Sequence, residues 1–473
     1  MKGIRNGKRG TAFLVLLAVL LALSACGGNK DAGGNNGTGG GEPSSAAATP
    51  QGEGGAPEPV EILVWDKPMA DDYMLPVREE LFAEFEKRYP HITVKHEHPP
   101  TGTSDRQVFV TAMAGGQGPD VYQNAYFPII GDWVKQGLVA DLTEYWNNYE
   151  DKDQFIPSSL MQSTIDGKIY GAPGSMYVMG LLYNKSMFEE AGLDPDAPPA
   201  DWDQFVEYGK ALTKSDKQQY GYSLLGMDWA DWFFEYYVWQ AGGDLTTRHE
   251  DGSVTLDFTK EPAVTALQFY KDLKWTHQIT QQNVLQDFDA NQNDFFQNRA
   301  AMIIYPSDTF GSLTDKGVDV NNIGYGPMPV GPAGVAPSQT GGAYWIINPT
   351  SDKAKQDAAW EYIAFMNSKE TMEKLLAFQQ ENGAVPNLLS VRLDVDPSQF
   401  VEGVPQSIIE GVRKAAENTQ LEYYLKERLS PYVVKAIQKV LTDANADPLT
   451  ALQEAEQAAQ KEIVDAFNAE IKS

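Results

Sequence analysis

The chain has 473 residues, with 65 aspartates and glutamates against 37 lysines and arginines, which gives a formal net charge of -28. A surface this acidic repels phosphate backbones and argues against nucleic-acid binding, and the length suits about two to three domains. The single cysteine cannot form an intramolecular disulfide, nor a cysteine-based metal site by itself.

Residues 1–25 have the pattern of a bacterial lipoprotein signal peptide. Basic residues precede an apolar run at 13–23, which is too short to span a bilayer. The sequence Leu-Ser-Ala-Cys at 23–26 resembles a lipobox. The resemblance implies that Cys26 receives a diacylglyceryl group, a palmitate-type anchor, and becomes the mature N-terminus; an ordinary secretory signal is the alternative. Residues 26–59 are rich in Gly, Asn, Ser and Pro, which predicts a disordered tether.

Short apolar strands and helical stripes alternate from residue 60 onward. Side-chain alternation predicts strands at 60–66 and 92–94, and apolar spacing predicts helices at 79–89 and 107–114. A Gly-rich turn then leads into a further strand at 120–122. The same pattern returns at 169–184, 301–305 and 344–347, and the C-terminal segment is mostly helical in pattern. Strands that alternate with helices in this way indicate an α/β fold with parallel sheet.

A series of short motifs runs through this region. The motifs are Val64-Trp65-Asp66, Ala114-Gly115-Gly116, Gly118-Pro119-Asp120-Val121, Gly137 to Leu142, Asp166 to Pro173, Leu182 to Lys185, Ala191-Gly192-Leu193, Trp202-Asp203, Gly242-Gly243, Ala300 to Met302, Gly341-Gly342 and Trp360 to Asn367. In this order they resemble the family 1 extracellular solute-binding proteins of ABC importers, which include maltose- and oligosaccharide-binding lipoproteins.

The resemblance implies a two-lobed, periplasmic-binding-protein-like α/β fold, with hinge crossovers and a ligand cleft between the lobes. By analogy, the first lobe holds 60–174 and 300–338, the second holds 175–299 and 339–440, and helices at 441–473 cover the seam. The implied function is capture of a solute by lobe closure and delivery to an ABC transporter permease. We expect a monomer without enzymatic activity or cofactor, anchored through lipid on the outer face of the bacterial cytoplasmic membrane.

The composition favours a carbohydrate as the solute. Sugars present flat C–H patches and rims of hydroxyl groups, so their sites combine aromatic faces with carboxylates or amides. The chain supplies 10 tryptophans and 22 tyrosines. Two alternatives stay open: the same fold with a peptide, a polyamine or a glycerol-phosphate-type ester, and a secreted carbohydrate-active hydrolase, which needs paired carboxylates.

The family places ligand contacts after strands and in the crossovers, and several residues match those places. They are Trp65 and Asp66 after the first strand, Asn124 and Tyr126 after the strand at 120–122, Tyr177 in the first crossover, Tyr305 and Asp308 after the strand at 301–304, and Gly342 and Tyr344 in the second crossover. The family often has a tryptophan where Tyr305 stands, so either Tyr305 replaces it or that platform is missing. The alternative is a structural role for each residue.

The segment 228–239 is unusually aromatic. On a helix, Phe233, Phe234 and Trp239 are expected in the core. Residues at the start of the helix are better placed to overhang a cleft, and these are Asp228, Trp229 and, as the first choice, Trp232. Glu422, Tyr423 and Tyr424 lie where the family adds a late aromatic contact, for which Tyr424 is the candidate.

Two patterns that imitate metal sites are better explained otherwise. The segment from Asp443 to Glu454 imitates a calcium loop, but Pro448 stands where a positive φ is needed. We therefore predict Asp447 as a helix N-cap, with Pro448 in the first turn. The histidines at 91, 96 and 98 lack further ligands at zinc spacing and predict a polar surface strand.

Overall fold

The computed structural model describes residues 57–66, 72–97, 105–126 and 129–471. The chain divides into two parts at residue 56, and only the second part, from Pro57, is described. The signal peptide predicted at 1–25, Cys26 and the tether up to residue 56 therefore lie outside the described residues. Within the described residues, no helix is long and apolar enough to cross a membrane.

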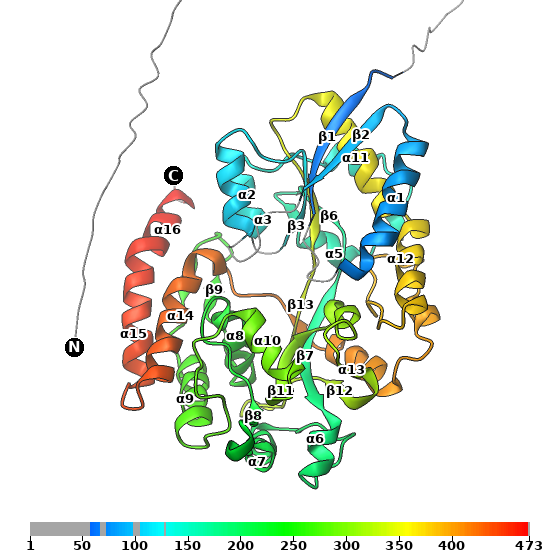
Figure 1. Ribbon diagram of the computed structural model, residues 1–473. Coiled ribbons are helices and arrows are strands. Elements are labelled where there is room, and N and C mark those ends of the chain that lie inside the picture. The colour runs from blue at the N-terminus through cyan, green and yellow to red at the C-terminus, as the bar shows by residue number, and fades with distance from the viewer. Residues whose placement is uncertain (1–56, 67–71, 98–104, 127–128, 472–473) are drawn as a thin grey trace, which may run out of the picture. The chain divides into compact units, whose positions relative to one another are not determined.

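The first lobe is built on a five-stranded sheet in the order β2-β1-β3-β14-β6 (Figure 1). Its strands are β1 (Val60–Trp65), β2 (Ile92–Glu97), β3 (Val121–Ala125), β6 (Ala172–Pro173) and β14 (Tyr344–Ile347). Strand β1 runs parallel to β2 and β3, whereas β14 is antiparallel to β3. Because β1 and β3 are parallel, their carboxyl ends meet at one edge, where Trp65 pairs with Tyr122.

Helices cover this sheet and close two hydrophobic clusters against it. They are α1 (Leu75–Arg88), α2 (Asp105–Ala114), α3 (Ile129–Lys135), α4 (Thr143–Asn147), α5 (Pro157–Met161), α11 (Lys353–Met366) and α12 (Lys369–Glu381). The hairpin of β4 (Thr164–Ile165) and β5 (Lys168–Ile169) turns at Asp166 and Gly167, both at positive φ, which is the conformation that Asp-Gly favours in a two-residue hairpin turn.

The second lobe is built on a six-stranded sheet in the order β15-β13-β7-β11-β8, with β12 also paired to β7. Its strands are β7 (Tyr177–Asn184), β8 (Tyr220–Tyr222), β11 (Ala300–Pro306), β12 (Ile323–Gly326), β13 (Ser338–Gly341) and β15 (Thr419–Gln420). A separate hairpin joins β9 (Thr246–Arg248) to β10 (Val254–Leu256). Strands β7 and β11 are buried along almost their whole length, which explains their continuous apolar sequences.

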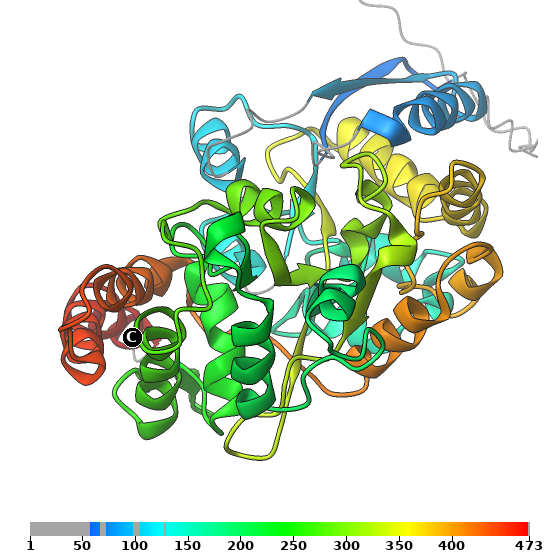
Figure 2. The same ribbon diagram turned by 60° about the horizontal axis from the view of Figure 1, so that its bottom comes forward.

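The helices of the second lobe pack into two hydrophobic clusters. They are α6 (Lys185–Glu190), α7 (Trp202–Leu212), α8 (Ala230–Gln240), α9 (Glu261–Trp275), α10 (Phe288–Phe296), α13 (Gln406–Ala416), α14 (Lys426–Thr442), α15 (Pro448–Ala459) and α16 (Asp465–Ile471). The smaller cluster takes in α13 and the end of α10. Helix α14 packs against α8 and α9, and α15 packs against α9. Figures 1 and 2 both show these C-terminal helices beside the green helices of the second lobe. Asp447 caps α15 through the backbone N–H of Thr450, as predicted.

Three stretches cross between the lobes. Residues 174–176 join β6 to β7, residues 342–343 join β13 to β14, and residues 382–405 join α12 to α13. The first two lie side by side, because the backbone N–H of Gly174 donates to the carbonyl of Ala343 at 2.8 Å. The third also reaches them, since Asn387 donates to the carbonyl of Met176 at 2.9 Å.

The two-lobed α/β architecture with hinge crossovers is confirmed, but the strand pairing corrects two expected lobe boundaries. Strand β11, expected in the first lobe with 300–338, pairs with β7 and β8 of the second sheet. Strand β14 and helix α11, expected in the second lobe with 339–440, belong to the first, where α11 packs on β1 and β14. Strand β11 lies between β7 and β8, and β14 lies between β3 and β6, so each is inserted between strands that are distant from it in sequence. The order of motifs along the chain does not record that pairing.

Candidate functional site

Side chains from both lobes meet at one place, which we call the interlobe cluster. The first lobe contributes α2 and the end of β3, and the second contributes β7, β13, α8 and α14. The cluster comprises Arg106, Tyr126, Tyr177, Trp229, Trp232, Gln339, Lys426 and Glu427.

The aromatic part of the cluster belongs to the second lobe and is centred on Trp232. The Trp232 ring centroid lies 6.4 Å from that of Tyr177, at 76°, and 6.3 Å from that of Trp229, at 88°. Phe288, at the start of α10, stacks on Trp232 at 6.3 Å and 27°. Edge-to-face and offset-stacked rings at these separations attract one another through their quadrupoles. The arrangement offers both faces and edges of aromatic rings.

Trp229 is held in an uncommon backbone conformation. Its φ of 69° places it in the left-handed region at the N-terminus of α8, and the residue is 37% exposed. A bulky residue with positive φ is rare, and such residues persist where the surrounding structure imposes them, often at binding sites. The Trp229 ring thereby comes within reach of Arg106 from the first lobe.

The first lobe contributes a cation and a phenol ring. The guanidinium carbon of Arg106 lies 3.7 Å from the centroid of the Tyr126 ring and 5.8 Å from that of Trp229. A guanidinium within about 6 Å of an aromatic face is attracted to it, so Arg106 bridges one ring from each lobe. The Tyr126 hydroxyl donates to the carboxylate of Glu427, which is on the second lobe.

The first turn of α14 makes three consecutive contacts in this region. Lys426 forms a buried ion pair with Glu422 at 2.5 Å and lies 5.4 Å from the Trp232 ring. Glu427 accepts from Tyr126, and Arg428 donates twice to Asp132 on α3, at 3.0 Å each. Burial raises the pKa of Glu422, and the Lys426 ammonium opposes that shift. These contacts form a polar rim beside the aromatic rings.

Four of the residues that the sequence predicts are brought together in the cluster, namely Tyr126, Tyr177, Trp229 and Trp232. Asp228 is exposed immediately before Trp229. Burial raises the pKa of Tyr177 well above its usual value, and the charges of Glu422 and Asp308 add to the shift. Asp308 therefore also lies within electrostatic reach of the cluster.

Trp65, Asp66 and Asn124 lie at the carboxyl ends of β1 and β3, the edge from which Tyr126 follows. Trp65 is 8% exposed and its indole N–H donates to Glu97 at 3.3 Å. The Asp66 carboxylate is buried, 3.7 Å from Arg78 and 3.8 Å from His96. His96 stacks on Phe82 at 3.6 Å, so the strand predicted to be a polar surface carries a half-buried histidine. Among the described residues, no cluster suited to a metal ion is found.

The remaining predicted residues lie outside the interlobe cluster. Tyr305 and Tyr344 are each 3% exposed. The Tyr305 hydroxyl donates to the carbonyl of Thr309 at 3.2 Å, and the Tyr344 hydroxyl donates to that of Ser159 at 2.7 Å. At Gly342 an added Cβ would lie 2.1 Å from the carbonyl oxygen of Ser175, so only glycine fits the crossover. Tyr424 lies under Arg248, 4.7 Å from its guanidinium, within the second lobe.

Sequence reasoning missed Arg106, Phe288, Gln339 and the residues 426–428. In the sequence, Lys426-Glu427-Arg428 has the pattern of a solvent-exposed helix start, and Arg106 is a lone cation at the start of a predicted helix. Their roles arise from tertiary contacts between segments about 300 residues apart, such as Tyr126 with Glu427. No local pattern encodes such a pairing.

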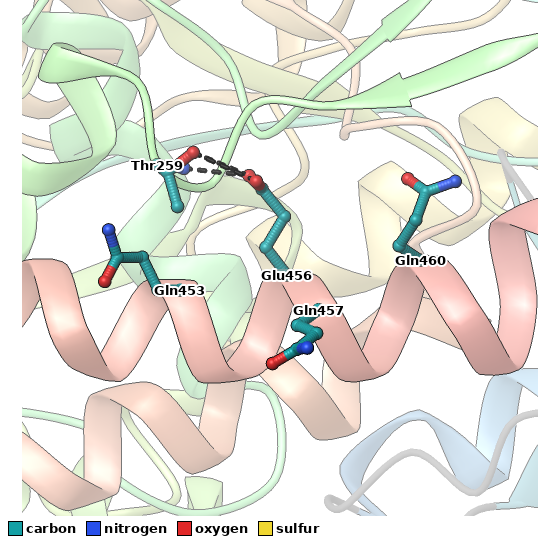
Figure 3. A pocket seen from close by; sticks show the side chains of 5 residues that line it. All are labelled: Thr259, Gln453, Glu456, Gln457 and Gln460. Atoms are coloured by element: carbon teal, nitrogen blue, oxygen red, sulfur yellow. Dashed lines mark hydrogen bonds between the residues drawn. The ribbon is translucent and has the colours of Figure 1, made fainter.

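Two hollows on the surface lie apart from these aromatic rings. Figure 3 shows one, lined by Thr259, by Gln453, Glu456 and Gln457 on α15, and by Gln460 immediately after α15. There the Glu456 carboxylate accepts hydrogen bonds from the backbone N–H and the hydroxyl of Thr259 at 3.0 Å each. Both carboxylate oxygens therefore already have a hydrogen-bond donor within the protein. The other is lined by Asp141, Thr143, Glu144, Asn147 and Asn148. Neither includes an aromatic ring or draws on both lobes.

Comparison with known proteins identifies the family. The model of the bacterial extracellular solute-binding protein family matches residues 71–373. The chain belongs to this family. Members of this family bind solutes outside the bacterial cell.

Relatives of this solute-binding protein cover most of its length. A putative binding protein of Brucella abortus is 29% identical over 321 residues, which cover 66% of this chain and 72% of the relative. The maltotriose-binding protein of Pyrococcus abyssi is 22% identical over 343 residues, covering 71% and 68%. A solved ABC transporter solute-binding protein of Thermotoga lettingae, bound with α-D-tagatose, superposes with a TM-score of 0.70 at 25% identity, over 85% of this chain and 99% of that one.

Proposed function

We propose that this solute-binding protein captures a sugar or an oligosaccharide between its lobes and delivers it to the permease of an ABC importer. The observation that carries the proposal is the convergence of Tyr126 and Arg106 from one lobe with Tyr177, Trp229 and Trp232 from the other. Aromatic faces suit the C–H patches of a sugar, and charged and amide groups suit its hydroxyls. The relatives that bind maltotriose and tagatose support the same class of solute.

The proposed binding set starts from the predicted residues that join the cluster. It comprises Tyr126, Tyr177, Asp228, Trp229 and Trp232, with Trp65, Asp66 and Asn124 at the neighbouring strand ends and Asp308 within electrostatic reach. A solute that contacts both lobes stabilises the arrangement in which they are together, so binding shifts the equilibrium towards closure. The solute is released unchanged, and the protein is not an enzyme in this proposal.

The first test is a ligand screen by thermal shift with mono-, di- and trisaccharides, peptides, polyamines and glycerol-phosphate esters. A ligand at 100 times its dissociation constant adds about 2.7 kcal/mol to the free energy of unfolding, which produces a clear shift in melting temperature. We expect a saccharide to shift it, with the sugar recovered intact by chromatography. A shift by peptides or phosphate esters alone would reassign the solute, and cleavage products would favour the hydrolase alternative.

We also propose that Cys26 carries the lipid that holds the protein at the outer face of the cytoplasmic membrane, and that the protein acts as a monomer. The support is the resemblance of residues 23–26 to a lipobox. In cells labelled with a palmitate analogue, the wild-type protein should take up label and sediment with membranes. Cys26→Ala should lose both properties. Label retained by Cys26→Ala would contradict the anchor.

A further inference from the structure

The crossover strand β13 carries a buried glutamine that links the aromatic side chains proposed to bind solute. Gln339 is 2% exposed. Its Oε1 accepts from the indole N–H of Trp232 at 2.5 Å and from the hydroxyl of Tyr236 at 3.0 Å. The Gln339 amide also lies beside Tyr177, where it opposes the rise in the pKa of that hydroxyl. One amide thus holds two aromatic side chains of α8 and lies next to a third, on β7.

The chemistry of the partners fixes which way this amide faces. An indole N–H can only donate, so Trp232 requires the amide oxygen and not the amide nitrogen. With two lone pairs, Oε1 serves both Trp232 and Tyr236. The amide nitrogen is then left for the Tyr177 oxygen, which can accept. The three contacts are mutually consistent in a single amide orientation.

The backbone around Gln339 is packed tightly against the same tyrosine. At Gly341, two residues further along β13, an added Cβ would lie 2.5 Å from the hydroxyl oxygen of the Tyr177 ring. Gly341 also pairs with Tyr177 across the sheet. The ring of Tyr177 is therefore confined by the β13 backbone, next to the Gln339 amide.

Rings that are already held in place cost less conformational entropy when a ligand binds. Each rotamer-rich side chain immobilised at binding costs about 0.5–1.5 kcal/mol, and pre-organisation removes this cost. Because Gln339 is buried beneath the rings, it acts on the solute through Trp232 and Tyr177 and not by direct contact. It is a positioning residue.

We propose that Gln339 fixes the orientation of the Trp232 and Tyr177 rings before solute arrives and thereby sets the affinity of the interlobe cluster. This inference rests on the proposed function, because it takes Trp232 and Tyr177 as solute contacts. It assigns to β13 a binding role beyond that of a connection between the lobes.

The test compares Gln339→Met, which keeps the volume but removes the acceptor, with Gln339→Glu, which keeps an acceptor oxygen. The first measurement is the indole N–H resonance of Trp232 in protein labelled at tryptophan nitrogen, assigned by its absence in Trp232→Phe. We expect the resonance to shift and to exchange faster with water in Gln339→Met, and to stay near its wild-type position in Gln339→Glu. An unchanged resonance in Gln339→Met overturns the proposal.

The second measurement is the dissociation constant for maltotriose by calorimetry. We expect Gln339→Met to weaken binding roughly two- to twelvefold, from the ordering cost above converted at tenfold per 1.4 kcal/mol, and Gln339→Glu to stay within about twofold of wild type. Equal losses in both variants, or a lowered melting temperature with unchanged affinity and resonance, would leave Gln339 a purely structural residue. If Gln339→Met does not fold, Gln339→Asn withdraws the oxygen by one methylene and should give the same loss.

The two measurements separate this inference from the function on which it rests. If wild-type protein does not bind maltotriose, the sugar assignment fails for that probe, while the indole resonance still decides whether Gln339 orients Trp232. If maltotriose binds and Trp232→Ala leaves affinity unchanged, the proposed contact at Trp232 fails. A Gln339 effect on affinity would then have to act through Tyr177, and Tyr177→Phe should abolish it.

Discussion

The ring of Trp232 is surrounded by aromatic neighbours, and its indole N–H donates a hydrogen bond to the buried Gln339. Its replacement tests the binding site at the scale of one residue. Trp232→Ala should weaken maltotriose binding by about 1–3 kcal/mol, the range for removing a ring that a ligand buries. Trp275→Ala is the matched control, because Trp275 is 36% exposed on α9 and its indole N–H is also bonded, to the carbonyl of Val440. Titration calorimetry measures the maltotriose affinity of both variants. If Trp232→Ala binds as tightly as Trp275→Ala, Trp232 is not part of the site.

Tyr344 illustrates what single residues in a sequence do not reveal. An aromatic residue beside a crossover matches a ligand contact and a core position equally well, and the choice depends on which sheet face it takes. The structure buries both Tyr344 and Tyr126, but Tyr126 contacts Arg106 and Glu427 of the interlobe cluster, whereas Tyr344 bonds to Ser159 within the first lobe. Tyr177, predicted on similar grounds, also joins the cluster. Aromatic residues at strand ends were thus predictable as a group, but their division between core and cluster depends on the fold.

Tyr344→Phe should accordingly change stability and not binding. The variant removes the hydroxyl that donates to the carbonyl of Ser159 at 2.7 Å. Loss of one such hydrogen bond costs about 0.5–1.5 kcal/mol. Urea unfolding should show this loss, while the maltotriose affinity stays within about twofold of wild type. A tenfold weaker affinity with normal stability would instead support Tyr344 as a ligand contact.

At the scale of elements, α8 sets the position of α14. Asp231 accepts from the Tyr423 hydroxyl at 2.6 Å and from the Ser430 hydroxyl at 2.8 Å, and Glu235 accepts from the Tyr423 backbone N–H at 2.5 Å. Both acids are fully buried on a helix of mostly aromatic residues. The sequence predicts the helix and its buried Phe233, Phe234 and Trp239. It does not predict that two buried carboxylates hold a segment so distant along the chain, because that contact is tertiary.

Glu235 should make stability depend on pH. Burial, together with the nearby acids Asp244 and Glu422, raises the pKa of Glu235 well above its usual value of 4.5, and Lys426 opposes the shift. The folded protein therefore holds this proton more tightly than the unfolded chain. The stability from Glu235 is fully present below about pH 4.5 and declines as pH rises through the folded pKa.

Glu235→Gln should remove that decline while keeping the acceptor for Tyr423. We expect the free energy of unfolding of the variant to fall less with pH between about pH 5 and pH 8 than that of wild type, as measured by urea unfolding at several pH values. Glu207→Gln, at an exposed position on α7, is the control and should leave the slope unchanged. Parallel curves for Glu235→Gln and wild type would show that Glu235 is ionised in the fold.

At the scale of the whole molecule, the lobes are joined by side chains as well as by the crossovers. Arg428 binds Asp132, Glu427 binds Tyr126, and the Lys135 ammonium lies 4.4 Å from the Phe467 ring. The family resemblance carried by the order of motifs implied two lobes and hinge crossovers, and the local strand and helix patterns predicted an α/β fold. It misplaced β11 and β14 and did not predict these contacts, since both depend on which distant segments meet.

The Asp132–Arg428 pair should therefore contribute to lobe closure. Both side chains are only partly exposed, at 15% and 33%, and two hydrogen bonds join them. A well-oriented pair of this kind is worth about 1 kcal/mol, or about fivefold in the ratio of closed to open forms. Arg428→Ala should weaken maltotriose binding by up to that factor, and it should increase the radius of gyration measured by X-ray scattering if the ligand-free protein is mostly closed.

A charge exchange separates this contribution from a simple loss of stability. Asp132→Arg alone places two cations together and should weaken binding at least as much as Arg428→Ala, because like charges oppose closure. Combining Asp132→Arg with Arg428→Asp restores a pair of opposite charges. The loss of binding free energy in this double variant should therefore be smaller than the sum of the losses in the two single variants. Additive losses in the double variant would show that the pair does not act across the lobes.

Because the pair is partly exposed, raising the salt concentration should reduce the difference in maltotriose affinity between wild type and Arg428→Ala.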